Sequence, residues 1–488
     1  MSSHSNRFRP RALTALRIRS CAAIVGAAAL TACTVGPNYK GAPVVAPNAM
    51  HAMAFNRAPQ DSTSTAPGVA NWWEALDDPE LNHLIETALT GSPDIRAARA
   101  RLQQSRAGLR EKQRNLLPKS SGSAAYLHTK LPQTGLGIGS VDLYDVGFDA
   151  TWEVDLFGGT QRAIEAASAE AAAVDADLAD THVSLSAEVA QTYIDLRDRQ
   201  QRIALIRESA DLEQQILTLT QQRREQGVAS DLDVERIRTQ VENTKSTLIP
   251  LDAQITESLD KLAVLTGREP GALDAELSAA GSLPKLPAVI PVGDPTALMR
   301  QRPDIRAAEY RLVSANAQIG EHEADWFPKL TLLGDLGFTA DIPSHLLRSS
   351  SFTWIGAPVL QWNALDFGRT KAKIDQAKAG FEEAEAKYES TVLGALRDAN
   401  VALSRYGHQR DNVVSLRVVE ESATRAATLT QQRYRAGTSS ALDWLDAERT
   451  RFSAQQNRIA GDAELIDDYV ALQKSLGLGW RAHSNDQT

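Results

Sequence analysis

Few residues of this 488-residue chain are spaced for catalysis or metal binding. Its nine histidines are scattered, and the pair His322-Glu323 lacks the second histidine four residues later that a zinc-protease helix needs. The glycine-rich stretch 135–139 has no following Lys-Ser/Thr and is better explained as a surface loop than as a phosphate loop. Only four methionines occur, which argues against a methionine-lined copper route. The sequence therefore predicts no enzyme, no cofactor and no metal site.

One cysteine lies in a context that predicts a covalent modification. Residues 1–32 contain five arginines and no acid, then an apolar core over 21–30, and end in Leu-Thr-Ala before Cys33. This arrangement resembles the lipobox of bacterial lipoproteins, which implies that Cys33 is lipidated and becomes the first mature residue. Thr34 stands where an aspartate would imply retention in the inner membrane, so the outer membrane is expected. The alternative is an ordinary secretory signal with an incidental cysteine.

The bulk composition excludes several classes of protein. The chain is 43% apolar and 23% charged, with a mean hydropathy of −0.29. After residue 32 no run of about eighteen apolar residues predicts a transmembrane helix. Because the leader carries five arginines and no acid, its removal would change the formal charge from −9 to −14. Such an acidic chain lacks the basic surface that neutralises phosphates, so nucleic acid is not an expected partner.

The chain contains an internal duplication with an offset of 210 positions. Pro-Asp-Ile-Arg-Ala-Ala occupies 93–98 and again 303–308, and Leu-Thr-Gln-Gln-Arg occupies 219–223 and again 429–433. Single residues that repeat at the same offset are Pro118 and Pro328, Trp152 and Trp362, Gly158 and Gly368, and Gly227 and Gly437. Several matches at one offset indicate two copies of a unit of about 210 residues.

Long helices are predicted in each copy. No glycine or proline occurs between residues 160 and 226, and apolar residues recur there in a near-heptad stripe. At ~1.5 Å per residue such a helix approaches ~100 Å, which suits a column across the periplasm better than a compact domain. After the turn at Gly227 a second helix is predicted to run to about Leu265, and its copy to about Leu476. Because the turns are short, the paired helices must be antiparallel. A shorter helical stretch precedes the strands of each copy, at 81–117 and 296–327.

Four segments alternate between apolar and polar residues, as strands with one apolar face do. The apolar members are Val146, Phe148, Ala150 and Trp152 in the first copy and Leu330, Leu332, Leu336 and Phe338 in the second. Segments near 123–128 and 352–362 complete two hairpins, and Trp152, Trp354 and Trp362 are candidate anchors at a membrane interface. For any one segment, an ordinary half-buried hairpin is an equally good interpretation.

Four strands are too few to close a barrel. Open strand edges in lipid leave backbone groups unsatisfied at several kcal/mol each, and the smallest bacterial barrels have about eight strands. Subunits must therefore pool their strands, and a trimer would supply twelve strands around a water-filled lumen.

Motifs spread over essentially the whole mature chain match one family. They are residues 34–39, 72–73, 76–81, 93–98, 155–158, 303–308, 366–368, 432–437 and 442–447. Together with the lipobox they resemble the TolC/OprM-like outer-membrane factor family, in its NodT-like lipoprotein branch. The resemblance implies a mainly α fold with a membrane β-barrel, in which two tandem structural repeats form long antiparallel helical hairpins. These hairpins would build a periplasmic tunnel below a trimeric twelve-stranded barrel.

The resemblance also implies a function. The chain would be the outer-membrane exit channel of a tripartite efflux pump, passively conducting drugs or other small toxic compounds to the exterior. Its partners would be a periplasmic membrane-fusion adaptor, an inner-membrane resistance–nodulation–division pump, outer-membrane lipid and two further copies of itself. The alternatives are the outer-membrane duct of a type I protein secretion system and a periplasmic coiled-coil scaffold lipoprotein. The scaffold would not explain the amphipathic strands.

The expected organisation has five parts. They are a removed signal peptide (1–32), a lipidated extended segment (33–70), a first repeat (71–280, strands near 120–155), a second repeat (281–480, strands near 329–366) and a tail (481–488).

Four residues near the helical turns are candidates for a periplasmic gate. Asp443 and Asp446 match family positions that form acidic rings at the tunnel entrance, where carboxylates from three chains would bind cations. The alternative for such acids is helix capping. Tyr434 and Asp233 match partners of a hydrogen-bond lock in the family.

The lock itself departs from the family pattern. Ser439 stands where the best-known lock has an arginine, so Arg433 or Arg435 would have to substitute.

Overall fold

The computed structural model describes residues 34–59, 61–130 and 140–480. The predicted signal peptide, Cys33 and the tail after residue 480 lie outside the described residues. The chain divides into two compact units, one formed by residues up to 43 with 103–173 and 308–388, the other by 44–102, 174–307 and the remainder. Within the described ranges, no helix has both the length and the apolarity needed to cross a membrane.

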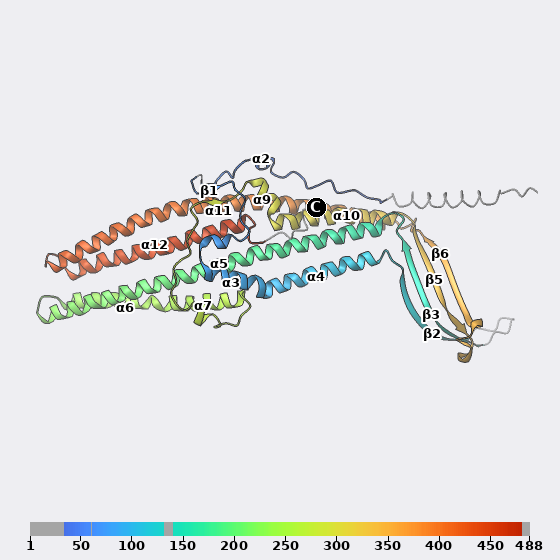
Figure 1. Ribbon diagram of the computed structural model, residues 1–488, viewed down its shortest axis with the longest axis horizontal. Helices are drawn as coiled ribbons and strands as arrows, with labels where there is room; N and C mark the ends of the chain where they lie inside the picture. The colour runs from blue at the N-terminus through green and yellow to red at the C-terminus, as the bar shows by residue number, and fades with distance from the viewer. Residues whose placement is uncertain (1–33, 60, 131–139, 481–488) are drawn as a thin grey trace, which may run out of the picture. The chain divides into compact units, whose positions relative to one another are not determined.

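Most of the helices and the longer strands are labelled in Figure 1. The helices are α2 (Pro47–Met50), α3 (Pro79–Gly91), α4 (Pro93–Arg114), α5 (Gly159–Glu225), α6 (Asp231–Ser246), α7 (Leu248–Leu265), α8 (Asp274–Leu277), α9 (Pro295–Gln301), α10 (Pro303–Glu323), α11 (Arg369–Arg435) and α12 (Ala441–Ser475). The strands are β1 (Thr63–Ser64), β2 (Lys119–Lys130), β3 (Ser140–Val154), β4 (Ile290–Pro291), β5 (Lys329–Ala340) and β6 (Phe352–Gln361). Short 3-10 helices are η1 (Trp72–Leu76), η2 (Ala324–Trp326), η3 (Pro343–His345) and η4 (Ser349–Ser351).

The first unit contains an antiparallel sheet with the strand order β2-β3-β5-β6 (Figure 1). Both predicted hairpins are present, and pairing of β3 with β5 joins them. The register places Phe148 opposite Leu336 and Leu336 opposite Trp354, so large apolar side chains of three strands share one face. Phe148 is 67% exposed and Trp354 71% exposed in the single chain. The sheet therefore presents an apolar face that its own chain does not cover.

The two longest helices are α5 and α11, with 67 residues each. Both ends of α11 lie 210 positions after the ends of α5, which is the offset of the sequence duplication. The helix predicted between residues 160 and 226 is present. In the absence of glycine and proline, nothing in that stretch removes a backbone donor or favours a turn.

The helix predicted to run as far as Leu265 is instead divided into α6 and α7, which meet at Thr247. Pro250 lies in the first turn of α7, where its missing N–H costs no helical hydrogen bond. The residue 210 positions later is Ala460, and α12 continues through it without a break. One proline therefore makes the two hairpins unequal.

The stretches predicted over 81–117 and 296–327 are also divided, immediately before a proline in each copy. Ser92 has ψ 136° and separates α3 from α4, whereas Arg302 has ψ 124° and separates α9 from α10. A following proline disfavours the helical conformation, so both residues adopt extended backbone.

Aromatic residues far apart in the chain form part of the core of the second unit. Trp72 is 2% exposed, and its ring centre lies 6.0 Å from that of Tyr469 on α12. The Tyr469 hydroxyl donates to the Trp72 carbonyl at 3.1 Å. This contact attaches the segment before α3 to the last long helix.

Candidate functional site

The turns at the ends of the two helical hairpins share one backbone design. Gly227 and Gly437 have φ of 74° and 76°, the left-handed region that glycine adopts without a Cβ penalty. The amide of Val228 donates to the Arg223 carbonyl at 2.9 Å, and that of Thr438 donates to the Arg433 carbonyl at 2.9 Å. These bonds satisfy carbonyls that the helix end leaves free. The duplication has thus preserved two equivalent tight turns, at the same end of the second unit (Figure 1).

A capping box starts the returning helix of each hairpin. The Asp233 amide donates to the Ser230 hydroxyl at 3.2 Å, and the Ser230 amide donates to the Asp233 carboxylate at 3.1 Å. Ser440 and Asp443 repeat the arrangement at 3.0 and 2.9 Å. Hydrogen bonds from the hydroxyl and amide of Ser230 hold the pKa of Asp233 below its ordinary value. The amide and hydroxyl of Ser440, with the hydroxyl of Ser439, lower the pKa of Asp443.

The four predicted gate residues therefore lie in one region but do different things in the single chain. Asp233 and Asp443 cap helices, which was the alternative considered for Asp443. Asp446 is exposed and lies 3.5 Å from Arg449. Within the described residues, no hydrogen bond joins Tyr434 to Asp233. The acidic ring stays a prediction, because a carboxylate that caps a helix is still exposed and charged. The lock also stays a prediction, because its hydrogen bonds could form between chains.

Tyr434 belongs to a cluster that packs the two hairpins against each other near their tips. Its side chain is 6% exposed, and its ring centre lies 5.2 Å from that of Trp444. The Arg223 guanidinium lies 4.6 Å from the Tyr434 ring centre, a cation–π geometry. The buried members of this tip cluster are Ile216, Leu217, Val234, Ile237, Val241, Tyr434, Trp444 and Leu445.

Sequence reasoning missed two side chains that pack against Tyr434 at the tips, Trp444 and Arg223. Trp444 stood within a family motif, and Arg223 stood within the repeated Leu-Thr-Gln-Gln-Arg segment, which served as evidence of the duplication. Trp444 also donates to buried Glu448 at 3.1 Å, and Arg451 pairs with that carboxylate at 2.6 Å. The cluster is therefore anchored by polar contacts on α12 as well as by apolar burial.

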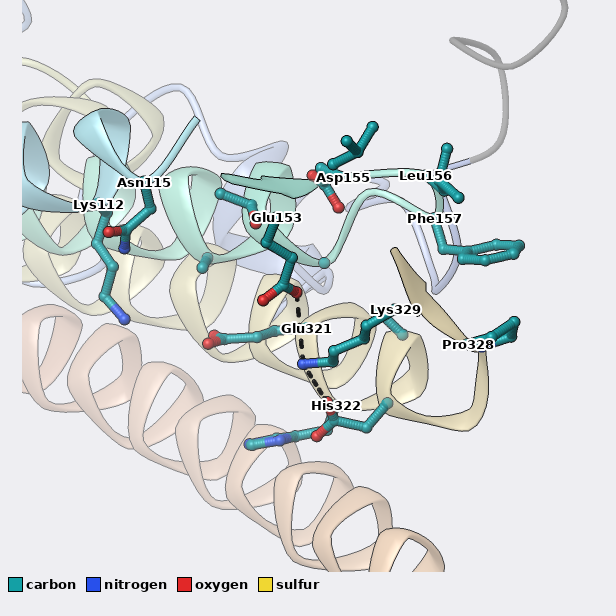
Figure 2. Close-up of a pocket in the computed structure, with 16 residues that line it drawn as sticks. Lys112, Asn115, Glu153, Asp155, Leu156, Phe157, Glu321, His322, Pro328 and Lys329 are labelled. Carbon is teal, nitrogen blue, oxygen red and sulfur yellow. Dashed lines mark ion pairs between the residues drawn. The ribbon is translucent and has the colours of Figure 1, made fainter. Parts of the chain in front are cut away.

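A polar pocket of about 230 Å³ lies in the first unit, where the strands meet the helices (Figure 2). Its charged lining residues are Lys112, Glu153, Asp155, Glu321, Asp325 and Lys329. The Lys329 ammonium lies 3.1 Å from Asp325 and 3.7 Å from Glu153, and Figure 2 shows it between acids. Among the described residues, no group of three or more acids, histidines or cysteines is arranged to hold a metal ion. Lys329 is therefore paired with acids on both sides at the base of the strands.

Comparison with known proteins identifies the family. The model of the family described as "Outer membrane efflux protein" matches residues 84–268 and 295–478, which together exceed half of the chain. The chain belongs to this family. The chain is therefore the outer-membrane component of an efflux system. It lies in the outer membrane and extends into the periplasm. The family match confirms the resemblance found in the sequence motifs.

Individual relatives of this outer membrane efflux protein cover nearly its whole length. The antibiotic efflux pump outer membrane protein ArpC of Pseudomonas putida is 30% identical over 92% of this chain and 93% of its own. The outer-membrane channel OprN shares 35% identity with a TM-score of 0.85, over 91% of this chain and 99% of its own. The MtrE outer membrane channel of Neisseria gonorrhoeae shares 28% identity with a TM-score of 0.81, over 92% and 98%.

Proposed function

We propose that three copies of the chain pool their strands into a twelve-stranded outer-membrane barrel and form the passive exit channel of a tripartite efflux pump. Each chain would consist of two repeats (71–280 and 281–480), and lipid on Cys33 would anchor it. The tips of the helical hairpins would narrow the periplasmic end. No chemical step is required of the protein, which conducts substrate and does not transform it.

The sheet of the first unit is the observation that carries this proposal. Its outer strands β2 and β6 each have one neighbour among the described residues, so one backbone edge of each is open. Its exposed apolar face suits contact with lipid, but the open edges do not, since unpaired N–H and C=O groups in hydrocarbon cost several kcal/mol each. Pairing of β2 with β6 of another copy removes both edges and closes a ring.

The partners of the channel follow from its relatives. ArpC is named as the outer membrane protein of an antibiotic efflux pump. We carry this assembly over to the present chain, with a periplasmic membrane-fusion adaptor and a resistance–nodulation–division pump as partners and small toxic compounds as cargo. A type I secretion duct would share the architecture, and deletion of the chain separates the two functions. If the chain serves an efflux pump, the deletion strain should retain more of a small dye inside the cell. If it serves a secretion system, the deletion strain should lose an exported protein from the medium.

Native mass spectrometry in detergent tests the assembly. We expect three copies per particle, each beginning at a diacylglyceryl-modified Cys33, because closure needs pooled strands and the leader precedes a lipobox-like sequence. A folded monomer with its β structure intact would contradict the shared barrel. An unmodified N-terminus at another position would contradict the lipid anchor alone, so the two parts of the proposal fail separately.

Replacing both Asp443 and Asp446 with asparagine tests the acidic entrance. In planar bilayers we expect lower cation selectivity and weaker block by multivalent cations, because six carboxylates around one axis would be lost. The capping geometry at Ser440 tolerates an asparagine side chain, so the helix start should survive. Asp233→Asn is a comparison variant that alters the equivalent cap of the other hairpin but keeps both ring acids, so we expect it to change cation selectivity less than the double variant does. Wild-type selectivity and block in the double variant would reduce both acids to helix-capping and surface roles.

A further inference from the structure

Residues 34–39, which we call the N-terminal strap, are bound along α5 and α10 in the first unit. Arg162 on α5 is the centre of this contact and is only 4% exposed. Its Nε donates to the Val35 carbonyl at 3.1 Å, and its Nη2 donates to the Gly36 carbonyl at 3.2 Å and to Asn38 Oδ1 at 2.7 Å. The remaining Nη1 pairs with Glu165 at 2.7 Å. The guanidinium fork is thus almost fully engaged, and most of its donors bind the strap.

Backbone and amide groups from both copies of the duplication complete the contact. The Val35 amide donates to the Phe157 carbonyl at 3.1 Å. Asn316 on α10 donates its side-chain amide to the Pro37 carbonyl at 3.0 Å. Polar groups along four consecutive strap residues are therefore satisfied by fixed partners, which distinguishes the strap from a flexible tether.

Glycines permit the strap to approach closely. A Cβ on Gly36, whose φ is 92°, would lie 2.3 Å from the Gly320 Cα on α10. A Cβ on Gly158, whose φ is 77°, would lie 2.9 Å from the Thr34 Cα. Neither backbone neighbour can give way as a flexible side chain would, so both positions require glycine for contact as well as for conformation.

The second copy of the duplication lacks this seat. Ala372 stands 210 positions after Arg162, and it has no donor with which to hold a strap. Gly368 stands 210 positions after Gly158 and has nearly the same φ, 88°, but an added Cβ would meet nothing within 4 Å. Both glycines therefore have a left-handed backbone, but only Gly158 is in contact with the strap.

We infer that Arg162, Gly158 and Gly320 form a dedicated intramolecular seat for the N-terminal strap, with Arg162 as its positioning residue. The seat fixes the chain immediately after Cys33 against the helix ends that support the strands. One consequence rests on the proposed lipid anchor. If Cys33 is lipidated, the seat sets where the acyl chains enter the membrane relative to the sheet. The anchor is then part of the folded body instead of a free tether.

Spin labelling of the full protein, purified from membranes in detergent, tests the seat. A nitroxide on Lys40→Cys reports strap mobility, and one on Ser168→Cys reports α5 itself. We expect Arg162→Ala to shorten the rotational correlation time of the label at position 40 severalfold and to leave the label at 168 unchanged. Arg162→Lys should give most of the same effect, since one ammonium keeps the charge near Glu165 but cannot reach three separated oxygens.

Gly158→Ala and Gly368→Ala form a matched pair, because both strain a left-handed backbone but only the first meets the strap. We expect the first alone to release the label at position 40. A label that stays restricted in both Arg162→Ala and Gly158→Ala, or release at 40 and 168 together, overturns the inference. Mass spectrometry of the labelled protein counts one nitroxide if the leader is removed and Cys33 is lipidated, two if the leader is removed and Cys33 is free, and three if the leader with Cys21 is retained and Cys33 is free. The nitroxide count therefore tests lipidation of Cys33, and the mobility of the label at position 40 tests the seat, so the two proposals can fail separately.

Discussion

Trp444→Ala is expected to destabilise packing at the helix tips by about 3–5 kcal/mol, the usual cost of removing a buried tryptophan. Trp444 is 6% exposed, contacts Tyr434 and belongs to the tip cluster, which joins residues of α5, α6, α11 and α12. Its loss leaves a cavity between the hairpins and deprives Glu448 of one donor. We expect faster hydrogen exchange in segments 212–217 and 234–241, and higher single-channel conductance in planar bilayers because the tips are less constrained.

Two comparison variants separate packing from hydrogen bonding at the tips. Trp444→Phe retains most of the apolar contact and should have a much smaller effect. Tyr434→Phe combined with Asp233→Ala tests the proposed lock, and we expect a moderate rise in conductance, since a hydrogen bond contributes only about 0.5–1.5 kcal/mol. Unchanged exchange and conductance in Trp444→Ala would refute a closing role for the tip cluster.

Asp467→Asn is expected to stabilise the protein by an amount that grows as the pH rises above 3.8 and is largest at alkaline pH. Burial, followed by the charge of nearby carboxylates, raises the pKa of Asp467 from 3.8 to about 8. These carboxylates are Asp195, Asp468, Asp198 and Glu464. Arg199 and Arg202 pair with Asp195 and Asp198, and one Asp467 oxygen has no hydrogen-bond partner in the described structure.

The direction of the pH dependence follows from proton linkage. Between pH 3.8 and about 8 the unfolded chain releases the Asp467 proton while the folded chain keeps it. The free energy of unfolding is therefore greatest below the unfolded-state pKa of Asp467. It falls by up to about 1.4 kcal/mol per pH unit as the pH rises to the folded-state pKa, and above that pKa it falls no further on account of Asp467. Allowing for partial solvent screening, a few kcal/mol should separate wild type from Asp467→Asn at pH 9. Thermal unfolding in detergent at pH 5, 7 and 9 measures this difference.

Asp468→Asn is the control for the Asp467 prediction. Burial, with Glu464 as the next cause, raises the pKa of Asp468 only to about 6, and Arg405 opposes the shift. Its advantage over wild type should therefore stop growing above about pH 6, two units before that of Asp467→Asn. A stability difference that does not change with pH for either variant would remove protonation as the cause.

Local patterns predicted the long elements because their causes are local. The bounds of α5 follow from a stretch without helix breakers that ends at Gly227, and the strand faces follow from a period of two. The division at Thr247 was missed because we extended the apolar pattern through Pro250, although a proline tolerated in a first turn also marks a new helix start. The same oversight applies at Pro93 and Pro303.

The parts that sequence reasoning could not reach depend on contacts between distant segments. Arg162 looks like any charged residue of an alanine-rich helix, and its strap partners lie 124–127 positions earlier. Arg223 meets Tyr434 only because two hairpins pack together. No window of neighbouring residues contains such pairs, since they are selected by tertiary packing and not by backbone propensity. The assignment of Tyr434 and Asp233 to a lock has the same difficulty and stays a prediction.

The duplicated chain has two copies of the helix start at Gly158 and Gly368 but only one N-terminus to place beside them. Three such protomers, arranged as proposed, would approximate six-fold rotational symmetry through their paired repeats. In that proposed arrangement the strap would occupy every second position around the ring and would reduce the symmetry to three-fold. The two repeats of each protomer would then differ, because only the first repeat has Arg162 and the strap that it binds. A duplication inside one chain thus retains an asymmetry that six separate single-repeat chains would not possess.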